Sequence, residues 1–242
     1  MLLYFTEKLK GLISPDHPSW AYVHLAQVVS IIAKGNSVHA SSTLIWLAQQ
    51  DSFANTFLFS NEENRRPWRA YLVYDAFQLI QKPTKALMDF YSRQLDSEQL
   101  NPALKYNIMK ALAAHGTSRS MELFEKHMWR HGGPYYMLVQ HRDKYECVQL
   151  IFNLCRTVKS SRQAHEILGM FFGETYEQGR ETPPIVFSEI NPVGDDAEKY
   201  IELFKAFIAD PGGMVLTEEE IQNIKGLIKK IEDSMAEKTL NE

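Results

Sequence analysis

The sequence predicts an all-α protein, built as a right-handed α-solenoid of about four helical hairpins with capping helices at both ends. Apolar residues recur at helical spacing along most of the chain. The pattern Pro-x-x-x-Tyr occurs at Pro18, Pro67 and Pro102, each time ahead of such a segment. A short polar break and a second helical segment then follow. Paired helices that cannot bury their apolar faces alone typically stack side by side.

The first helix of each unit is marked by its proline. Proline suits the first turn of a helix, where its missing N–H would have no partner, so we expect the tyrosine one turn in. A fourth unit, HRDKY, keeps the tyrosine without the proline. The four tyrosines are Tyr22, Tyr71, Tyr106 and Tyr145. The apolar stripes that follow them include Val28 and Ile32, Val73 and Phe77, Ile108 and Leu112, and Val148 and Ile151.

A hydroxyl residue stands just before each predicted second helix. These residues are Ser37, Thr84, Ser118, and Ser160 or Ser161. A hydroxyl at this position accepts a hydrogen bond from a free N–H of the first turn and contributes about 1 kcal/mol. Ser160 with Gln163 also fits a capping box. The segment DSFANTFLFSNEENRR is an insertion between the first two units.

Prolines and composition predict three regions. Residues 1–172 hold the repeats, opened by a capping helix over 1–13. Residues 173–195 contain Pro183, Pro184 and Pro192 and form a linker. Residues 196–242 form a helical pair, the second helix opening with a capping box from Thr217 to Glu220. We expect this pair to cap the stack, the alternative being that it swings free on the linker.

The segment PALKYNIMKALAAHGTSRSMELFEKHM resembles a HEAT or armadillo-type repeat. The likeness is in the small residues Ala111, Ala113 and Ala114 of the first helix, the glycine-containing turn and the apolar second helix. It covers about residues 18–172 and concerns architecture. HEAT repeats often carry an aspartate in the turn between their helices, and none of the four turns here has one. The resemblance implies a curved stack of helices that binds another molecule.

Composition is that of a soluble globular protein of 242 residues, 45% of them hydrophobic, with a net charge of −4. Charge is segregated: residues 104–163 hold ten Lys and Arg against four Asp and Glu, whereas residues 164–242 hold seven against seventeen. Cys147 and Cys155 are too far apart on one helix for a disulfide, which favours a reduced setting. No signal peptide or membrane-spanning run is evident. We expect a cytoplasmic protein, or one translocated into a host cell.

Bases follow the caps of three second helices: Lys85, Arg119 and Arg162. A cation in the first turn opposes the helix dipole and costs about 0.3–1 kcal/mol. In a stack, these bases and the free N–H groups would align as an anion-binding edge, with Arg156 and Lys159 near its end. The alternative is that each base pairs with a carboxylate of a neighbouring unit.

Motifs for catalysis are missing from the sequence, which has no Gly-x-Ser-x-Gly, Walker or Cys-x-x-Cys pattern. His127 and His131 have the i, i+4 spacing of a metal pair. His131 precedes Gly132 and Gly133, and His115 precedes Gly116, so both resemble cations at a helix C-terminus before a glycine cap. No glutamate follows His127 as a zincin motif requires. We therefore expect no metal, cofactor or catalytic residues.

The function predicted from the sequence is a scaffold or adaptor that binds a protein partner, with no enzymatic activity. One alternative is a nucleic-acid binder similar to HEAT-like DNA glycosylases. Its basic and aromatic residues would be Trp68, Trp129, Tyr135, Tyr136, Arg130 and Arg142. A second alternative is a secreted bacterial effector, because the segment TEEEIQNIKG resembles the tail signals of some such proteins.

Overall fold

The computed structural model describes residues 21–35, 37–50, 68–131, 134–173 and 196–241. Every regular element in these ranges is a helix, and none of the described residues lies in a strand. The predicted all-α class is therefore confirmed. The chain divides into two compact units, Met1–Gly132 and Gly133–Glu242, which are described one at a time below. The predicted capping helix over 1–13, the insertion after residue 50 and all of the predicted linker except Gly173 lie outside the described residues.

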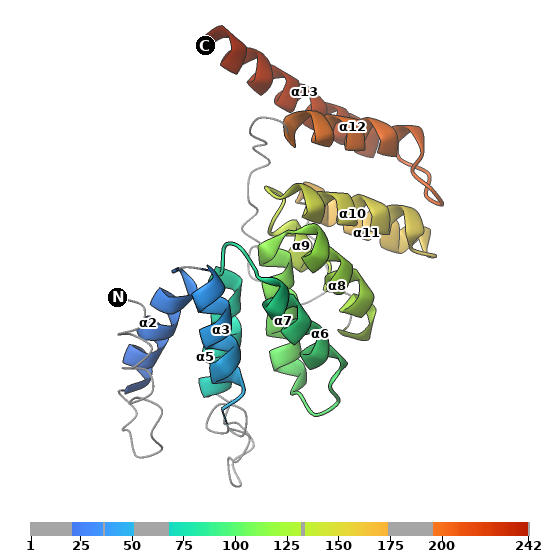
Figure 1. Ribbon diagram of the computed structural model, residues 1–242. Helices are drawn as coiled ribbons and strands as arrows, with labels where there is room; N and C mark the ends of the chain where they lie inside the picture. The colour runs from blue at the N-terminus through green and yellow to red at the C-terminus, as the bar shows by residue number, and fades with distance from the viewer. Residues whose placement is uncertain (1–20, 36, 51–67, 132–133, 174–195, 242) are drawn as a thin grey trace. The chain divides into compact units, whose positions relative to one another are not determined.

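The first unit has its described helices in two layers (Figure 1). One layer holds α2 (Ala21–Ala33), α5 (Trp68–Ala76) and α7 (Pro102–His115), which contact one another in succession. The other holds α3 (Ser37–Ala48), α6 (Lys85–Asp96) and α8 (Ser118–Met128), also in succession. The predicted first helices form one layer and the predicted second helices the other.

Local signals in the sequence explain where α7 begins and ends. Pro102 occupies the first turn, and the Asn101 side chain accepts a hydrogen bond of 2.8 Å from the Ala103 N–H. Gly116 ends the helix with a φ of 55°, a left-handed conformation that glycine adopts without steric cost.

Aromatic residues fill the core of the first unit. Phe77, Phe90 and Tyr91 are fully buried and contact one another edge-on or tilted, with ring centroids 5.3–6.3 Å apart. The Tyr91 hydroxyl lies 3.1 Å from Nε2 of buried His115, and the two rings stack. This contact joins α6 to the end of α7 and gives a buried hydroxyl the polar partner it needs.

The second unit contains five described helices: α9 (Tyr136–Val139), α10 (Tyr145–Thr157), α11 (Ser161–Phe172), α12 (Asp196–Ala209) and α13 (Glu218–Asn241). α10 packs on α11 and also on α12, and α12 packs on α13. Phe152 of α10 lies at the centre, with ring centroids 5.1 Å from Phe171, 5.2 Å from Phe204 and 4.7 Å from Phe207. Aromatic burial therefore fixes the C-terminal pair of helices to α10 and α11.

The tyrosines on which the predicted repeats are based do not occupy one helical position. Tyr106 lies one turn into α7, as expected, but Tyr145 is the first residue of α10. Tyr106 is exposed, whereas Tyr145 is half-buried against Tyr200 of α12, with ring centroids 5.4 Å apart. The prediction of a tyrosine one turn in is thus wrong for α10, where no proline fixes the helix start. The domain limits drawn from the sequence stay predictions.

Candidate functional site

The second helices α6 and α8 contact each other within the first unit. Asp96, the last residue of α6, accepts a hydrogen bond of 3.3 Å from Nζ of Lys126 near the end of α8. Arg130, just beyond α8, places Nη1 3.5 Å from the same carboxylate. The C-terminal ends of the two helices therefore meet at Asp96, and the N-terminus of each helix is the end remote from it.

Hydroxyl caps define where these second helices begin. The Thr84 hydroxyl accepts from the Leu87 N–H at 3.2 Å, as predicted. For α8 the cap is Thr117 and not Ser118; Thr117 and Ser120 form a reciprocal capping box. Ser160 caps α11 by accepting from the Gln163 N–H at 3.4 Å. The hydroxyls fix the first turns and hold the following bases at helix N-termini.

Lys85 and Arg119 occupy the first turns of α6 and α8, the ends of these helices that lie away from Asp96. Both side chains are exposed. Arg119 donates to Glu122 of its own helix at 2.7 Å, an i, i+3 pair. No described carboxylate forms an ion pair with Lys85. Among the residues that the structure describes, neither base forms an ion pair with a carboxylate of another helix pair. We call Lys85 and Arg119 together the basic edge.

Arg162 and Lys159 belong to the second unit and are described within it. Arg162 lies in the first turn of α11, is exposed, and donates from Nε to Glu166 at 3.0 Å. Lys159 is exposed in the turn before α11. The i, i+4 pair with Glu166 is a surface contact, worth at most a few tenths of a kcal/mol, so it holds Arg162 only weakly.

Arg142 and Arg156, two other candidate binding residues, make contacts inside the second unit. Arg142 donates to the Phe171 carbonyl at 2.6 Å and lies over the Phe171 ring. Arg156 donates from Nε to the Asp210 carbonyl at 2.9 Å, with its guanidinium 5.4 Å from the Phe207 ring centroid. Both guanidinium groups satisfy carbonyls at helix ends and stack on aromatic rings. Packing within the second unit therefore explains the positions of both arginine side chains without a bound partner.

Asp96 carries the densest cluster of charge in the described part of the first unit. Besides Lys126 and Arg130, buried His127 places Nε2 3.9 Å from its carboxylate. The hydrogen bond from Lys126 and the nearby positive charges hold the pKa of Asp96 below its ordinary value. The signal for this cluster in the sequence is the spacing of residues 126, 127 and 130 on one helical face, which fits a shared carboxylate partner.

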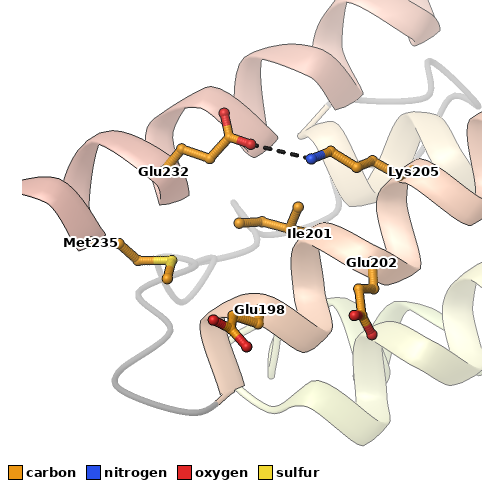
Figure 2. A pocket seen from close by; sticks show the side chains of 6 residues that line it. All are labelled: Glu198, Ile201, Glu202, Lys205, Glu232 and Met235. Carbon is orange, nitrogen blue, oxygen red and sulfur yellow. Dashed lines mark hydrogen bonds and ion pairs between the residues drawn. The ribbon is translucent and has the colours of Figure 1, made fainter.

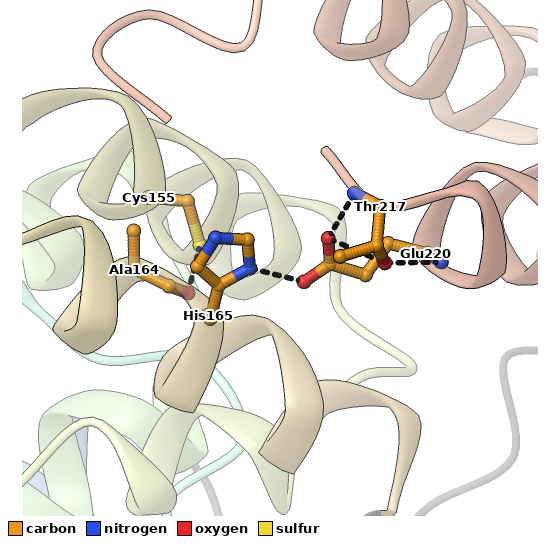
Figure 3. A network of polar contacts seen from close by, with 5 residues as sticks. All are labelled: Cys155, Ala164, His165, Thr217 and Glu220. Carbon is orange, nitrogen blue, oxygen red and sulfur yellow. Dashed lines mark hydrogen bonds and ion pairs between the residues drawn. The ribbon is translucent and has the colours of Figure 1, made fainter. Parts of the chain in front are cut away.

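A second polar network joins α11 to α13, and the sequence analysis missed its histidine (Figure 3). His165 Nδ1 lies 2.6 Å from Glu220 Oε1. The other carboxylate oxygen of Glu220 accepts from the N–H of Thr217 at 2.7 Å, and Thr217 Oγ1 accepts from the Glu220 N–H. The predicted capping box is thus confirmed. Glu220 closes the first turn of α13 and also fixes it to α11.

Cys147, Cys155 and His127 lie in the core, whereas the side chain of His131 lies outside the described part of the chain. Burial raises the pKa of both Cys147 and Cys155 to about 12, which keeps the thiols protonated and unreactive. Cys155 donates to the Ala164 carbonyl (Figure 3). Within the described ranges, no group of three or more His, Cys, Asp or Glu side chains is arranged to hold a metal ion.

The aromatic residues considered for nucleic-acid binding fall in different parts of the chain. Trp129 is 49% exposed and precedes Arg130 at the end of α8. Tyr135 and Tyr136 are half-buried in the second unit. The side chain of Trp68 is outside the described part. Among the described helices, none is long and apolar enough to cross a membrane.

Comparison of the chain with protein-family models, with curated proteins and with solved structures finds no match. Its function must therefore be argued from the residues and geometry given above.

Proposed function

We propose that this chain is a helical-repeat scaffold that binds an acidic segment of a protein partner through the basic edge. In this proposal the chain is the right-handed α-solenoid predicted from the sequence, and Arg162 and Lys159 are cations of the same kind in the second unit. The C-terminal helices α12 and α13 then form the last layer of the stack.

The observation that supports this proposal is that exposed cations occupy the first turns of α6 and α8, neighbouring helices whose C-terminal ends meet at Asp96. We infer that the two helices run side by side in the same direction, which brings both cations and both helix N-termini to one edge. The first four N–H groups of a helix have no partner within it, and each cap satisfies only some of them. A partner carboxylate placed there would meet N–H donors, the positive end of the dipole and a base.

Local energetics also support a binding role for these bases. A cation in the first turn destabilises its helix by about 0.3–1 kcal/mol. For Lys85 no described carboxylate offsets this cost by an ion pair, and for Arg119 the offset is a single exposed pair. A bound anion would offset the unfavourable interaction between each base and the dipole of its helix, at both helices together.

Affinity capture with charge-reversed variants tests the proposal. The variant is Lys85→Glu with Arg119→Glu in the full chain. The matched control is Lys225→Glu with Lys229→Glu, two exposed lysines of α13. We expect the unmodified chain and the control to retain proteins that the variant does not retain. Retention of these proteins should fall at high salt. Equal retention by all three chains would refute the basic edge as the binding surface.

Nucleic-acid binding is the second candidate function, supported by the ten Lys and Arg against four Asp and Glu in residues 104–163. Filter binding of single- and double-stranded oligonucleotides over a salt series separates the two functions. Binding through several phosphates gives an affinity that falls steeply and linearly on logarithmic axes. The protein-scaffold proposal predicts weak retention of oligonucleotides at physiological salt.

A further inference from the structure

An open groove of about 360 Å³ lies between the helices α12 and α13 of the second unit. Its lining consists of Glu198, Ile201, Glu202, Lys205, Glu232 and Met235 (Figure 2). The volume is near the lower end of the range for ligand-binding pockets, about 300–1,000 Å³. It suits one or two side chains of a partner better than an enclosed small molecule.

The floor of the groove is apolar. Along α13 the buried positions Ile224, Ile228 and Ile231 form one stripe, and Met235 continues it one turn later. Met235 is only half-buried, as is Ile201 on α12. The apolar stripe of α13 therefore extends past its fully buried section into the groove.

The rim of the groove is acidic on the α12 side. Glu198 and Glu202 are exposed and lie one helical turn apart. Lys205 pairs with Glu232 across the helices at 3.3 Å, which neutralises both charges at one end (Figure 2). The carboxylates of Glu198 and Glu202 therefore give the groove a net negative charge.

The spacing of Glu198 and Glu202 is unfavourable for an isolated helix. Like charges at i and i+4 repel each other, whereas a lysine at position 202 would attract Glu198 and stabilise α12. Asp196 and Glu198 in the first turn of α12 already interact favourably with the positive end of the helix dipole. Glu202 lies beyond this turn and adds little to that stabilisation. A cation bound between the two carboxylates would remove the repulsion.

We propose that this groove docks a basic amphipathic helix of a partner protein. One apolar side chain of the partner inserts between Ile201 and Met235, and Lys or Arg residues on its flanks contact Glu198 and Glu202. Charge complementarity selects this occupant, because an acidic or neutral segment would leave the two carboxylates without compensation. The site lies on different helices from the basic edge and is independent of it.

Fluorescence anisotropy with a defined probe tests the proposal. The probe is an 18-residue labelled peptide of Leu and Lys with one apolar helical face. We expect it to bind the full chain, and we expect Glu198→Gln with Glu202→Gln to raise the dissociation constant about threefold to tenfold, the effect of two exposed ion pairs. Met235→Gln should also weaken binding, because it removes an apolar contact from the floor.

Two controls keep the test specific. Glu98→Gln with Glu125→Gln removes the same charge from exposed positions of the first unit and should leave the affinity unchanged. A peptide with Glu in place of Lys should not bind. Equal losses in both double variants would show that only net charge matters and would overturn the proposal. A concentration-dependent dimer, measured by light scattering and dissolved by the Glu198 and Glu202 changes, would identify the groove as a contact between copies and also overturn it.

Discussion

Gly212 lets the turn between α12 and α13 pass close to the end of α10. Its φ of 69° is in the left-handed region, and a Cβ at this position would lie 2.7 Å from the carbonyl oxygen of Arg156. The preceding Asp210 accepts the Arg156 guanidinium hydrogen bond and also accepts from the Gly212 N–H at 3.1 Å. One glycine therefore allows the close approach on which the placement of the turn depends.

Replacing Gly212 by alanine should destabilise the second unit by at least about 1–2 kcal/mol, the cost of a left-handed L-residue, with the contact to Arg156 adding to it. Gly213→Ala is the matched control, because its Cβ would have no neighbour within 4 Å, and it should be neutral or slightly stabilising. Urea unfolding followed by circular dichroism measures both. Equal midpoints for the two variants would show that the turn does not need a glycine at 212.

The Asp96 carboxylate makes the stability of the first unit depend on pH. Since its pKa is held below its ordinary value of 3.8, mainly by the hydrogen bond from Lys126, the stabilisation from this carboxylate is present above that pH. It is lost as pH falls through the lower folded-state pKa. The ends of α6 and α8 should thus separate more readily in acid.

Removing the Lys126 ammonium should raise the pKa of Asp96 towards 3.8. Lys126→Met tests this while keeping the length of the side chain. Lys110→Met is the control, because Lys110 pairs with Asp75 at 3.4 Å and not with Asp96. Carboxyl chemical shifts of Asp96, followed by NMR over pH, give the value. An unchanged pKa in Lys126→Met would mean that the Lys126 hydrogen bond does not form in solution.

At the scale of the element, the start of α13 depends on Glu220. Its carboxylate closes the capping box with Thr217 and contacts His165 of α11 (Figure 3). The acid-rich first turn of Glu218, Glu219 and Glu220 also suits the positive end of the helix dipole. The same side chain therefore begins the helix and fixes it to its neighbour.

Glu220→Gln should loosen the first turn of α13. We expect the amides of this turn to exchange with solvent about tenfold faster, since loss of a cap costs about 1 kcal/mol and the contact with His165 is weakened as well. Glu219→Gln removes the same charge one residue earlier, at an exposed position, and should change exchange much less. Hydrogen exchange measured by mass spectrometry would contradict this account if both variants behaved alike.

The sequence predicted these elements well where a local signal was strong. Thr84, Pro102 and the Thr217–Glu220 box mark helix starts because each satisfies or removes an orphan N–H within a few residues. The tyrosine did not predict the start of α10 because this unit lacks the proline. Helix α10 begins at Tyr145, four residues later than His141, which corresponds to Pro102 in the repeat register. The short helix α9 has only four residues and leaves too few positions for a periodic pattern.

The candidate site was harder to predict than the elements. Arg142 and Arg156 look like surface cations in the sequence, yet the carbonyls they satisfy are 29 and 54 residues away. His165 likewise meets Glu220 across 55 residues. Such pairings form between residues far apart in the sequence when helices pack together. The periodic pattern of apolar residues within a helix does not predict them. Lys85 and Arg119 could be predicted because their position depends only on the caps beside them.

At the scale of the whole molecule, the proposed function requires that α6 and α8 run side by side, so that their first turns form one edge. The two helices contact each other, and their C-terminal ends meet at Asp96. If the helices are parallel, Lys85 and Arg119 lie on the same edge. A single acidic segment of a partner then contacts both cations.

A pulsed EPR distance between spin labels at Lys85→Cys and Ser118→Cys tests this most directly. Both residues are exposed first residues of their helices, and the native cysteines are buried. The axes of neighbouring helices pack about 8–10 Å apart. We predict one narrow distribution centred below about 25 Å, which allows for one neighbouring-helix step plus the label arms. A broad distribution, or one centred far beyond this distance, would contradict the common edge.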